Sequence, residues 1–167
     1  LEPIASLTRG GSPARPESAS RAGRRDYEAE TTIIQKGLDL SMAYCVYSYY
    51  VGGCCGDRNR LISTPTGVVR DPVYYMKAKK IAARTDTEAV EIDRKKKTVD
   101  VKNLSTGKTE TLPYDKLIVA TGAYPRMPPV PGTDLKGIST LQSMPDADFL
   151  RKVRDEGKIK KAVVVGG

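Results

Sequence analysis

The sequence predicts an α/β fold in which a parallel sheet carries an inserted three-stranded antiparallel β-meander. Three observations lead to this prediction. The first 35 residues alternate between a weakly apolar stretch, a stretch of helical composition and a β-branched stretch. Residues 87–112 hold three short strand-like runs separated by polar turns, and residues 117–120 are continuously apolar. Strands that alternate with helices are typical of a parallel sheet, whereas strands joined by short polar turns form an antiparallel one.

The amino-terminal part of the chain predicts a β-α-β unit. Residues 1–12 would form the first strand and reach a glycine pair, Gly10-Gly11. Residues 12–25 contain Ala, Arg and Glu in the manner of a helix. Residues 30–35, "ETTIIQ", are short and β-branched, which favours a second strand.

The middle of the chain predicts one helix and five strands. The helix spans residues 71–80. The strands span residues 81–84, 87–93, 98–102, 108–112 and 117–120. The last strand, "LIVA", is uniformly apolar, which is typical of a strand buried on both faces.

A connector, a helix and a strand are predicted at the carboxyl-terminal end. Four prolines between residues 125 and 131 favour an extended connector. Ser143 and Asp146 form a capping signature, which predicts that a helix begins there. The apolar face of this helix would hold Phe149, Leu150 and Val153. Residues 161–167, "KAVVVGG", predict a buried strand that runs into glycines.

Composition excludes several kinds of function. The chain has 167 residues, enough to bury one core and part of a second. It contains no histidine, so it cannot itself supply the imidazole base of a serine or cysteine protease triad. Two of its three cysteines, Cys54 and Cys55, are adjacent and lack the spacing of a zinc site, so no metal is expected.

Charge and hydropathy indicate a cytoplasmic protein. No apolar run has the length of a membrane span, the first 30 residues are too polar for a secretory signal, and three cysteines suit a reducing compartment. The net charge of +8 favours binding to a polyanion, but the basic residues fall in three separate groups along the sequence. Such scatter favours solvated faces over a nucleic-acid surface, and phosphorylated cofactors are the alternative polyanions.

Cys45 lies within "SMAYCVYSYYVGG", residues 41–53, where four tyrosines surround it. Free cysteines are among the most buried residues, so these residue types alone favour a packed cysteine over a reactive one. The motifs that surround Cys45 favour a reactive cysteine instead.

Several motifs resemble one family. "YDKLIVATGAYPRMPPVPG" at residues 114–132 resembles the Ala-Thr-Gly segment of the flavoprotein disulfide reductases that bind two dinucleotides. "SMAYCVYSYYVGG", followed by "DRNRLIS", is similar to the single-cysteine branch: coenzyme A disulfide reductase, NADH oxidase and NADH peroxidase. "TEAVEIDRKKKTV" at residues 87–99 and the final "AVVVGG" extend the resemblance to essentially the whole chain.

The resemblance implies a Rossmann-like FAD-binding domain at residues 1–132 that contains the meander. Residues 133–167 would be the connector helix and first strand of a truncated NAD(P)H-binding domain, most of which would lie beyond Gly167. Electrons would pass from NAD(P)H to FAD, then to Cys45, then to a disulfide. The oxidase and peroxidase alternative uses a sulfenic acid at Cys45.

The same resemblance implies partners and site residues. The acceptor would be a coenzyme A disulfide, another small disulfide, a peroxide or oxygen, with no nucleic acid or membrane, and the parent would be a homodimer. Catalysis would rest on Cys45 and on the Ser41 hydroxyl, which would favour the thiolate. FAD would contact Gly10, Gly11, Ser12, Gln35, Lys36, Val90, Ala120, Thr121 and Gly122. Coenzyme A would contact Arg21, Arg24, Tyr44 and Lys79.

Arg15, Gln35 and Glu17 are among the residues that depart from the family pattern. Arg15 stands where a small residue would let the first helix approach the strand. Gln35 offers an uncharged amide where the family has an acid for the ribose hydroxyls, and Glu17 falls where a hydroxyl is expected near phosphate. A flavin-binding fragment without turnover is therefore a further hypothesis.

Overall fold

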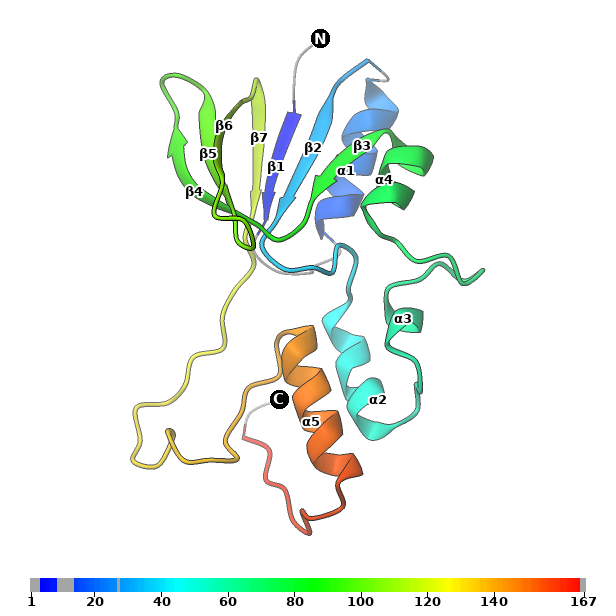
Figure 1. Cartoon of the computed structure of the whole chain (residues 1–167), viewed down its shortest axis with the longest axis vertical. Helices are drawn as coiled ribbons and strands as arrows, with labels where there is room; N and C mark the ends of the chain where they lie inside the picture. Colours follow the sequence, from blue (N-terminus) through cyan, green and yellow to red (C-terminus); the bar gives the residue numbers. More distant parts are fainter. Residues whose placement is uncertain (1–3, 9–13, 27, 166–167) are drawn as a thin grey trace. The chain divides into compact units, whose positions relative to one another are not determined.

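The computed structural model describes residues 4–8, 14–26 and 28–165 (Figure 1). Two compact units divide the chain. The first unit comprises residues 1–43 and 59–123, and the second comprises residues 44–58 and 124–167. Each unit is therefore assembled from two separate stretches of sequence.

A four-stranded parallel sheet forms the centre of the first unit. Its strands are β1 (Ile4–Thr8), β2 (Thr31–Gln35), β3 (Ile81–Arg84) and β7 (Lys116–Ala120), in the spatial order β3-β2-β1-β7. All three neighbouring pairs are parallel. The predicted β-α-β unit is confirmed, because α1 (Ala14–Arg25) connects β1 to β2.

The helix before β3 has clear start and stop signals. In α4 (Pro72–Lys79), the Asp71 carboxylate accepts a hydrogen bond of 2.7 Å from the backbone N–H of Tyr74, and proline occupies the first turn. The helix ends at Lys80, which adopts the left-handed conformation with φ 53°. No described helix is long and apolar enough to cross a membrane.

Helices and meander pack on opposite faces of the parallel sheet. Ile33 joins a buried cluster with Ala19 of α1 and Tyr75 of α4. Its neighbour Ile34 packs instead with Val99 and Val101 of the meander and with Tyr114. Successive strand residues point to opposite faces, so these two isoleucines anchor two separate layers (Figure 1).

The meander agrees with the prediction to within a residue or two at each strand end. It comprises β4 (Thr87–Asp93), β5 (Thr98–Asn103) and β6 (Thr109–Pro113), paired antiparallel in that order. The register of β4 shifts between Ala89 and Glu91, which places Val90 at a bulge-like irregularity.

The prediction that β7 is buried on both faces is wrong. Val119 remains 59% exposed, and no residue of β7 is fully buried. The reason is the strand order: among the described residues, β7 is an edge strand of its sheet and pairs only with β1. An apolar composition does not reveal the position of a strand within a sheet.

The second unit contains two helices that pack together. A 3-10 turn, η1 (Tyr44–Val46), leads into α2 (Tyr47–Gly52), which contacts α5 (Met144–Asp155). The capping box predicted for α5 is present, because Ser143 and Asp146 each accept a hydrogen bond from the other's backbone N–H. The short helix α3 (Arg58–Leu61) lies where the chain passes between units.

Two predictions for the carboxyl-terminal residues are wrong. Phe149 is 46% exposed, and α5 buries Met144 and Ala147 instead. Residues 161–165 form no strand, and their three valines are almost fully exposed. A strand requires the backbone of a neighbouring strand, and none of the described residues pairs with this segment. The assignment of residues 133–167 to a nucleotide domain stays a prediction.

Candidate active site

Three parallel strands end together at one edge of the sheet in the first unit. Thr8 of β1 lies in register with Gln35 of β2 and with Ala120 of β7. From β1 the sheet extends to β2 and β3 on one side and to β7 on the other, so the strand order reverses here. Open parallel sheets bind their ligands outside the carboxyl ends of the strands at such a reversal. This edge is where a dinucleotide fits.

The backbone after β7 is open to a ligand at the same edge. Thr121 and Gly122 are exposed, and Gly122 has a φ of 72°, which favours glycine. Val90, at the irregularity of β4, is 55% exposed. The predicted residues Gly10, Gly11 and Ser12 lie outside the described residues. The topology and the β7 turn therefore fit FAD.

Gln35 and Lys36 are already engaged within the first unit. The Gln35 side chain is buried, and its Nε2 atom donates a hydrogen bond of 3.2 Å to the carbonyl oxygen of Asp39. Lys36 Nζ lies 2.7 Å from Glu88 Oε1. One of the two amide hydrogens of Gln35 is thus already used in the hydrogen bond to the Asp39 carbonyl oxygen. The predicted contact between Gln35 and the flavin ribose stays a prediction.

A basic pocket lies at the opposite, amino-terminal edge of the same sheet. It has a volume of about 320 Å³ and brings together Arg24 at the end of α1 and Lys79 at the end of α4. These residues were predicted to bind coenzyme A from segments more than 50 positions apart. Arg21 does not line the pocket. Glu17 pairs with Arg24 at 3.4 Å and so partly neutralises this arginine.

Cys45 lies in the second unit, in the η1 turn that immediately precedes α2. Its side chain is exposed, as is that of Tyr44, whose ring lies 5.8 Å from the ring of Tyr47. The cysteine therefore occupies a turn that leads directly into a helix. An exposed sulfur is accessible to a small disulfide, which a packed cysteine would not be.

Ser41 belongs to the first unit, whereas Cys45 belongs to the second. Burial raises the pKa of Tyr75 above its ordinary value, and a hydrogen bond with Ser41 opposes that rise. The predicted action of Ser41 on the Cys45 thiolate stays a prediction.

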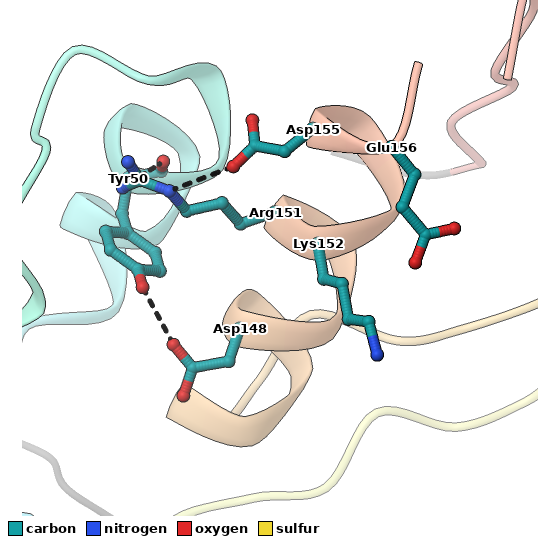
Figure 2. Close-up of a pocket in the computed structure, with 6 residues that line it drawn as sticks. All are labelled: Tyr50, Asp148, Arg151, Lys152, Asp155 and Glu156. Atoms are coloured by element: carbon teal, nitrogen blue, oxygen red, sulfur yellow. Dashed lines mark hydrogen bonds and ion pairs between the residues drawn. The ribbon is translucent and has the colours of Figure 1, made fainter. Parts of the chain in front are cut away.

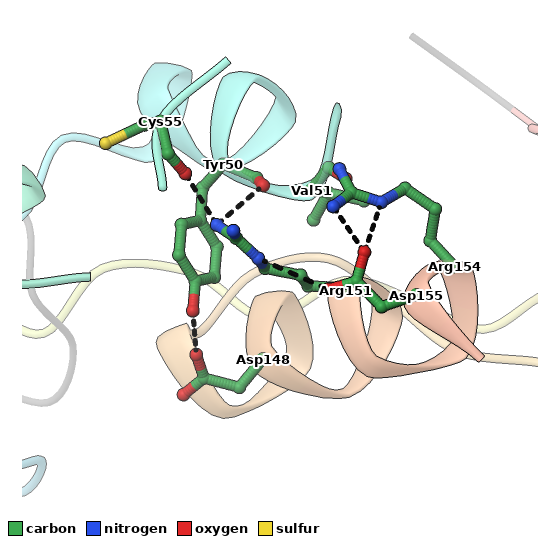
Figure 3. Close-up of polar contacts among 7 residues, drawn as sticks. All are labelled: Tyr50, Val51, Cys55, Asp148, Arg151, Arg154 and Asp155. Atoms are coloured by element: carbon green, nitrogen blue, oxygen red, sulfur yellow. Dashed lines mark hydrogen bonds and ion pairs between the residues drawn. The ribbon is translucent and has the colours of Figure 1, made fainter. Parts of the chain in front are cut away.

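Helix α5 packs against α2, the helix that follows Cys45. Arg151 lies with its guanidinium 4.4 Å from the centre of the Tyr50 ring and donates hydrogen bonds to the carbonyl oxygens of Tyr50 and Cys55, at 3.4 and 2.5 Å (Figure 3). Arg154 donates to the carbonyl of Val51. These cations meet the carboxyl-terminal end of α2, where backbone carbonyls carry partial negative charge.

Asp148 completes this contact. It accepts a hydrogen bond of 2.9 Å from the Tyr50 hydroxyl and pairs with Arg58 at 3.3 Å. Figure 2 shows the adjoining hollow of about 540 Å³, which three carboxylates and two cations line together with Tyr50. Because its charges are mixed, the hollow selects neither anions nor cations. We interpret the contact between α5 and α2 as structural support for the segment that carries Cys45.

Sequence reasoning missed the residues that form this support. Asp148, Arg151 and Asp155 follow one another at spacings of three and four, which places them on one face of a helix. That pattern could have shown a polar contact face on α5. It could not have shown that the partner is α2, about 100 residues earlier in the sequence.

The family model of the pyridine nucleotide-disulphide oxidoreductases matches residues 10–167. The chain belongs to this family. The resemblance drawn from the sequence motifs is therefore confirmed, and so is the α/β fold.

NADH oxidases and coenzyme A disulfide reductases are among the relatives that this chain resembles. An NADH oxidase of Enterococcus faecalis is 33% identical over 146 residues, which cover 84% of this chain and 29% of the oxidase. A coenzyme A disulfide reductase of Staphylococcus haemolyticus is 33% identical over 148 residues, which cover 89% of this chain and 32% of the reductase. The chain thus spans about a third of the length of these relatives.

A solved structure is similar in fold. The NAD-dependent persulfide reductase from A. fulgidus superposes with a TM-score of 0.84 and 38% identity, over 92% of this chain and 28% of the reductase. The similarity therefore extends over nearly all of the chain.

Proposed function

We propose that the chain is the flavin-binding part of an NAD(P)H-dependent reductase that acts on coenzyme A disulfide. One observation carries the choice of substrate: Arg24 and Lys79 line a single basic pocket. Coenzyme A bears a pyrophosphate and a 3′-phosphate, so its recognition requires cations close together. Neither oxygen nor peroxide would require such a pocket.

The chain's own residues would perform the thiol chemistry. The Cys45 thiolate would attack one sulfur of the coenzyme A disulfide, forming a mixed disulfide on Cys45 and releasing one coenzyme A as its thiolate. Two electrons would then cleave the mixed disulfide, releasing the second coenzyme A and restoring the Cys45 thiolate. Bound FAD, held outside the carboxyl ends of β1, β2 and β7, would supply the relay of those electrons from NAD(P)H.

Formation of the mixed disulfide tests this function. The reduced chain is mixed with coenzyme A disulfide, and the modified residue is located by fragmentation mass spectrometry. We expect the adduct on Cys45, its absence in Cys45→Ser, and slower formation in Arg24→Ala. An adduct confined to Cys54 and Cys55, or an unchanged rate in Arg24→Ala, would contradict the proposal.

The NADH oxidase relative supports a second candidate, in which Cys45 cycles through a sulfenic acid. The exposed position of Cys45 suits a peroxide as well as a disulfide. Treatment with one equivalent of hydrogen peroxide and a sulfenic-acid trap distinguishes the two. Rapid trapping at Cys45, together with no measurable binding of coenzyme A, would favour the oxidase.

A further inference from the structure

Two adjacent cysteines, Cys54 and Cys55, have no part in the proposed function. They follow the carboxyl-terminal end of α2, and both are free thiols. Cys54 is exposed, whereas Cys55 is half-buried and its Sγ atom donates a hydrogen bond of 3.3 Å to the carbonyl oxygen of Asp57. The turn after α2 therefore carries two neighbouring thiols, and small reagents in solution reach the first of them directly.

Helix α2 separates this pair from Cys45. The helix has six residues and is about 9 Å long, with Cys45 before its first turn and the pair after its last. Two cysteines whose Cα atoms lie more than about 7 Å apart cannot be bridged unless the backbone moves. A sulfur of the pair that has reacted therefore meets its own neighbour before it meets Cys45.

Glycines on both sides allow the pair to close into a small ring. The sequence reads Gly52-Gly53-Cys54-Cys55-Gly56, and the peptide between the cysteines is trans. Adjacent Cα atoms lie about 3.8 Å apart, whereas disulfides usually join Cα atoms about 4.4–6.8 Å apart. A disulfide here would be strained, and strained disulfides are readily reduced again. The flanking glycines lower the cost of the backbone twist, so the ring can form and remains reversible.

Two hydrogen bonds hold the backbone on either side of the pair. The N–H of Cys54 donates to the carbonyl oxygen of Tyr49 at 2.9 Å, and Arg151 donates to the carbonyl oxygen of Cys55 at 2.5 Å (Figure 3). A ring between the two sulfurs twists the backbone between these two anchors, which redirects the Cys55 carbonyl. The reduced pair thus fits the contact between α5 and α2, and the ring opposes it.

We propose that Cys54 and Cys55 are a second redox pair, which low-molecular-weight disulfides oxidise to a disulfide in competition with the hydrogen bond from Arg151. The exposed Cys54 sulfur attacks the small disulfide, forming a mixed disulfide and releasing one thiol. The Cys55 sulfur then attacks the mixed disulfide, closing the ring and releasing the other thiol; this step is fast because it is intramolecular. The pair loses two electrons and two protons, and the small disulfide gains both.

A chain with Cys45→Ser isolates the pair, because no other cysteine remains in the sequence. The reduced variant is mixed with bis(hydroxyethyl) disulfide, a small uncharged disulfide, and its intact mass is followed. We expect the loss of two hydrogens with no thiol added, and a peptide fragment in which Cys54 and Cys55 are joined. A mixed disulfide that persists, a covalent dimer, or no reaction would overturn the proposal.

Cys54→Ser and Cys55→Ser, each made in the Cys45→Ser chain, are the matched controls. Each retains a single thiol, so Cys55→Ser should keep a stable mixed disulfide at Cys54, and neither should lose two hydrogens. Because Cys45 is absent throughout, failure of the ring to form leaves the proposed reductase function intact. Failure of Cys45 to react with coenzyme A disulfide would, in turn, leave the pair intact.

Arg151→Ala tests the competition between the ring and the contact of α5 with α2. The Cys45→Ser chain, with and without this change, is equilibrated in a buffer of mercaptoethanol and its disulfide. Because Arg151 bonds to the Cys55 carbonyl of the reduced pair, its removal should shift the equilibrium about tenfold towards the ring. Lys152→Ala, an exposed cation on the same helix, should cause no shift. An unchanged equilibrium in Arg151→Ala, or an equal shift in both variants, would overturn this competition.

Discussion

Gly53 is the residue at which α2 turns towards Cys54 and Cys55. Its φ of 87° is left-handed, and its N–H donates to the carbonyl of Tyr50. A Cβ atom at this position would lie 2.5 Å from Nη1 of Arg154. The backbone angle therefore favours glycine, and a Cβ atom here would displace the end of the Arg154 side chain.

Gly53→Ala should destabilise the second unit by about 1–2 kcal/mol, because alanine is strained in the left-handed conformation and displaces Arg154. The measurement is thermal denaturation followed by circular dichroism. Gly52→Ala is the control, since nothing lies within 4 Å of its added Cβ atom. Equal stability of the two variants would show that the turn is not held in this conformation.

Tyr50 makes the second unit sensitive to high pH. Burial, followed by the hydrogen bond to Asp148, raises the pKa of Tyr50 above its ordinary value of 10.0. The folded chain thus holds this proton more tightly than the unfolded chain, so the stabilisation is complete below pH 10.0 and lost as the pH rises through the folded-state pKa.

Urea unfolding at a series of pH values around 10 tests this linkage. The unfolding free energy should decline as the pH increases, and Tyr50→Phe should show a shallower decline. Tyr75→Phe serves as the comparison, because burial also raises the pKa of Tyr75 but this residue lies in the first unit. If the unfolding free energy declined equally steeply with pH in wild type and in Tyr50→Phe, Tyr50 would be excluded as the cause of the decline.

At the scale of elements, α2 depends on α5. A helix of six residues is too short to be stable alone, so its order must come from packing. Tyr47 and Tyr50 supply the apolar part of that packing, and Arg151 supplies two hydrogen bonds to backbone carbonyls. The position of Cys45 thus depends on a helix far along the chain.

Arg151→Ala should destabilise α2 by about 2 kcal/mol, through the loss of carbonyl hydrogen bonds and of the contact with the Tyr50 ring. Hydrogen exchange of the amides at residues 47–52 measures the effect, with strand β5 of the first unit as an internal reference. Lys152→Ala, an exposed cation on the same helix, should leave exchange unchanged. Unaltered protection of α2 in Arg151→Ala would exclude this support.

The elements that the sequence predicted well are those with local signals. The β-branched run ending at Gln35 and the capping box at Ser143 depend only on neighbouring residues, and the structure confirms both. The burial of β7 was misjudged, because sheet order depends on distant pairing. The hydrogen bonds from Arg151 to the backbone carbonyls at and just after the end of α2 were missed for the same reason.

For the candidate site, sequence similarity brought residues together that local patterns could not. Arg24 and Lys79 were predicted as one site and line one pocket. Lys77, Lys80 and Thr31 also line this pocket and were not predicted, because nothing in their own sequence neighbourhood distinguishes a pocket residue from a solvated one.

At the scale of the whole molecule, the chain spans about a third of its relatives. We predict negligible steady-state NADH oxidation by these 167 residues alone, even after incubation with FAD, because only a small part of the predicted NAD(P)H-binding domain falls within residues 133–167. Absorbance of NADH provides the assay, and visible flavin absorption after desalting provides the control for FAD binding. Turnover equal to that of a complete flavoenzyme would refute this prediction.

The second unit is built from two sequence segments, and 98 positions separate Tyr50 from Asp148. A ribosome adds about 5–20 residues per second, so Cys45 emerges roughly 5–20 seconds before its supporting helix has been synthesised. Throughout that interval the Cys45 thiol lies on a nascent segment that cannot yet be supported by α5. The Cys45 thiol is therefore positioned only after α5 has been synthesised, and a cell that makes this chain during oxidative stress exposes the sulfur before the fold can position it.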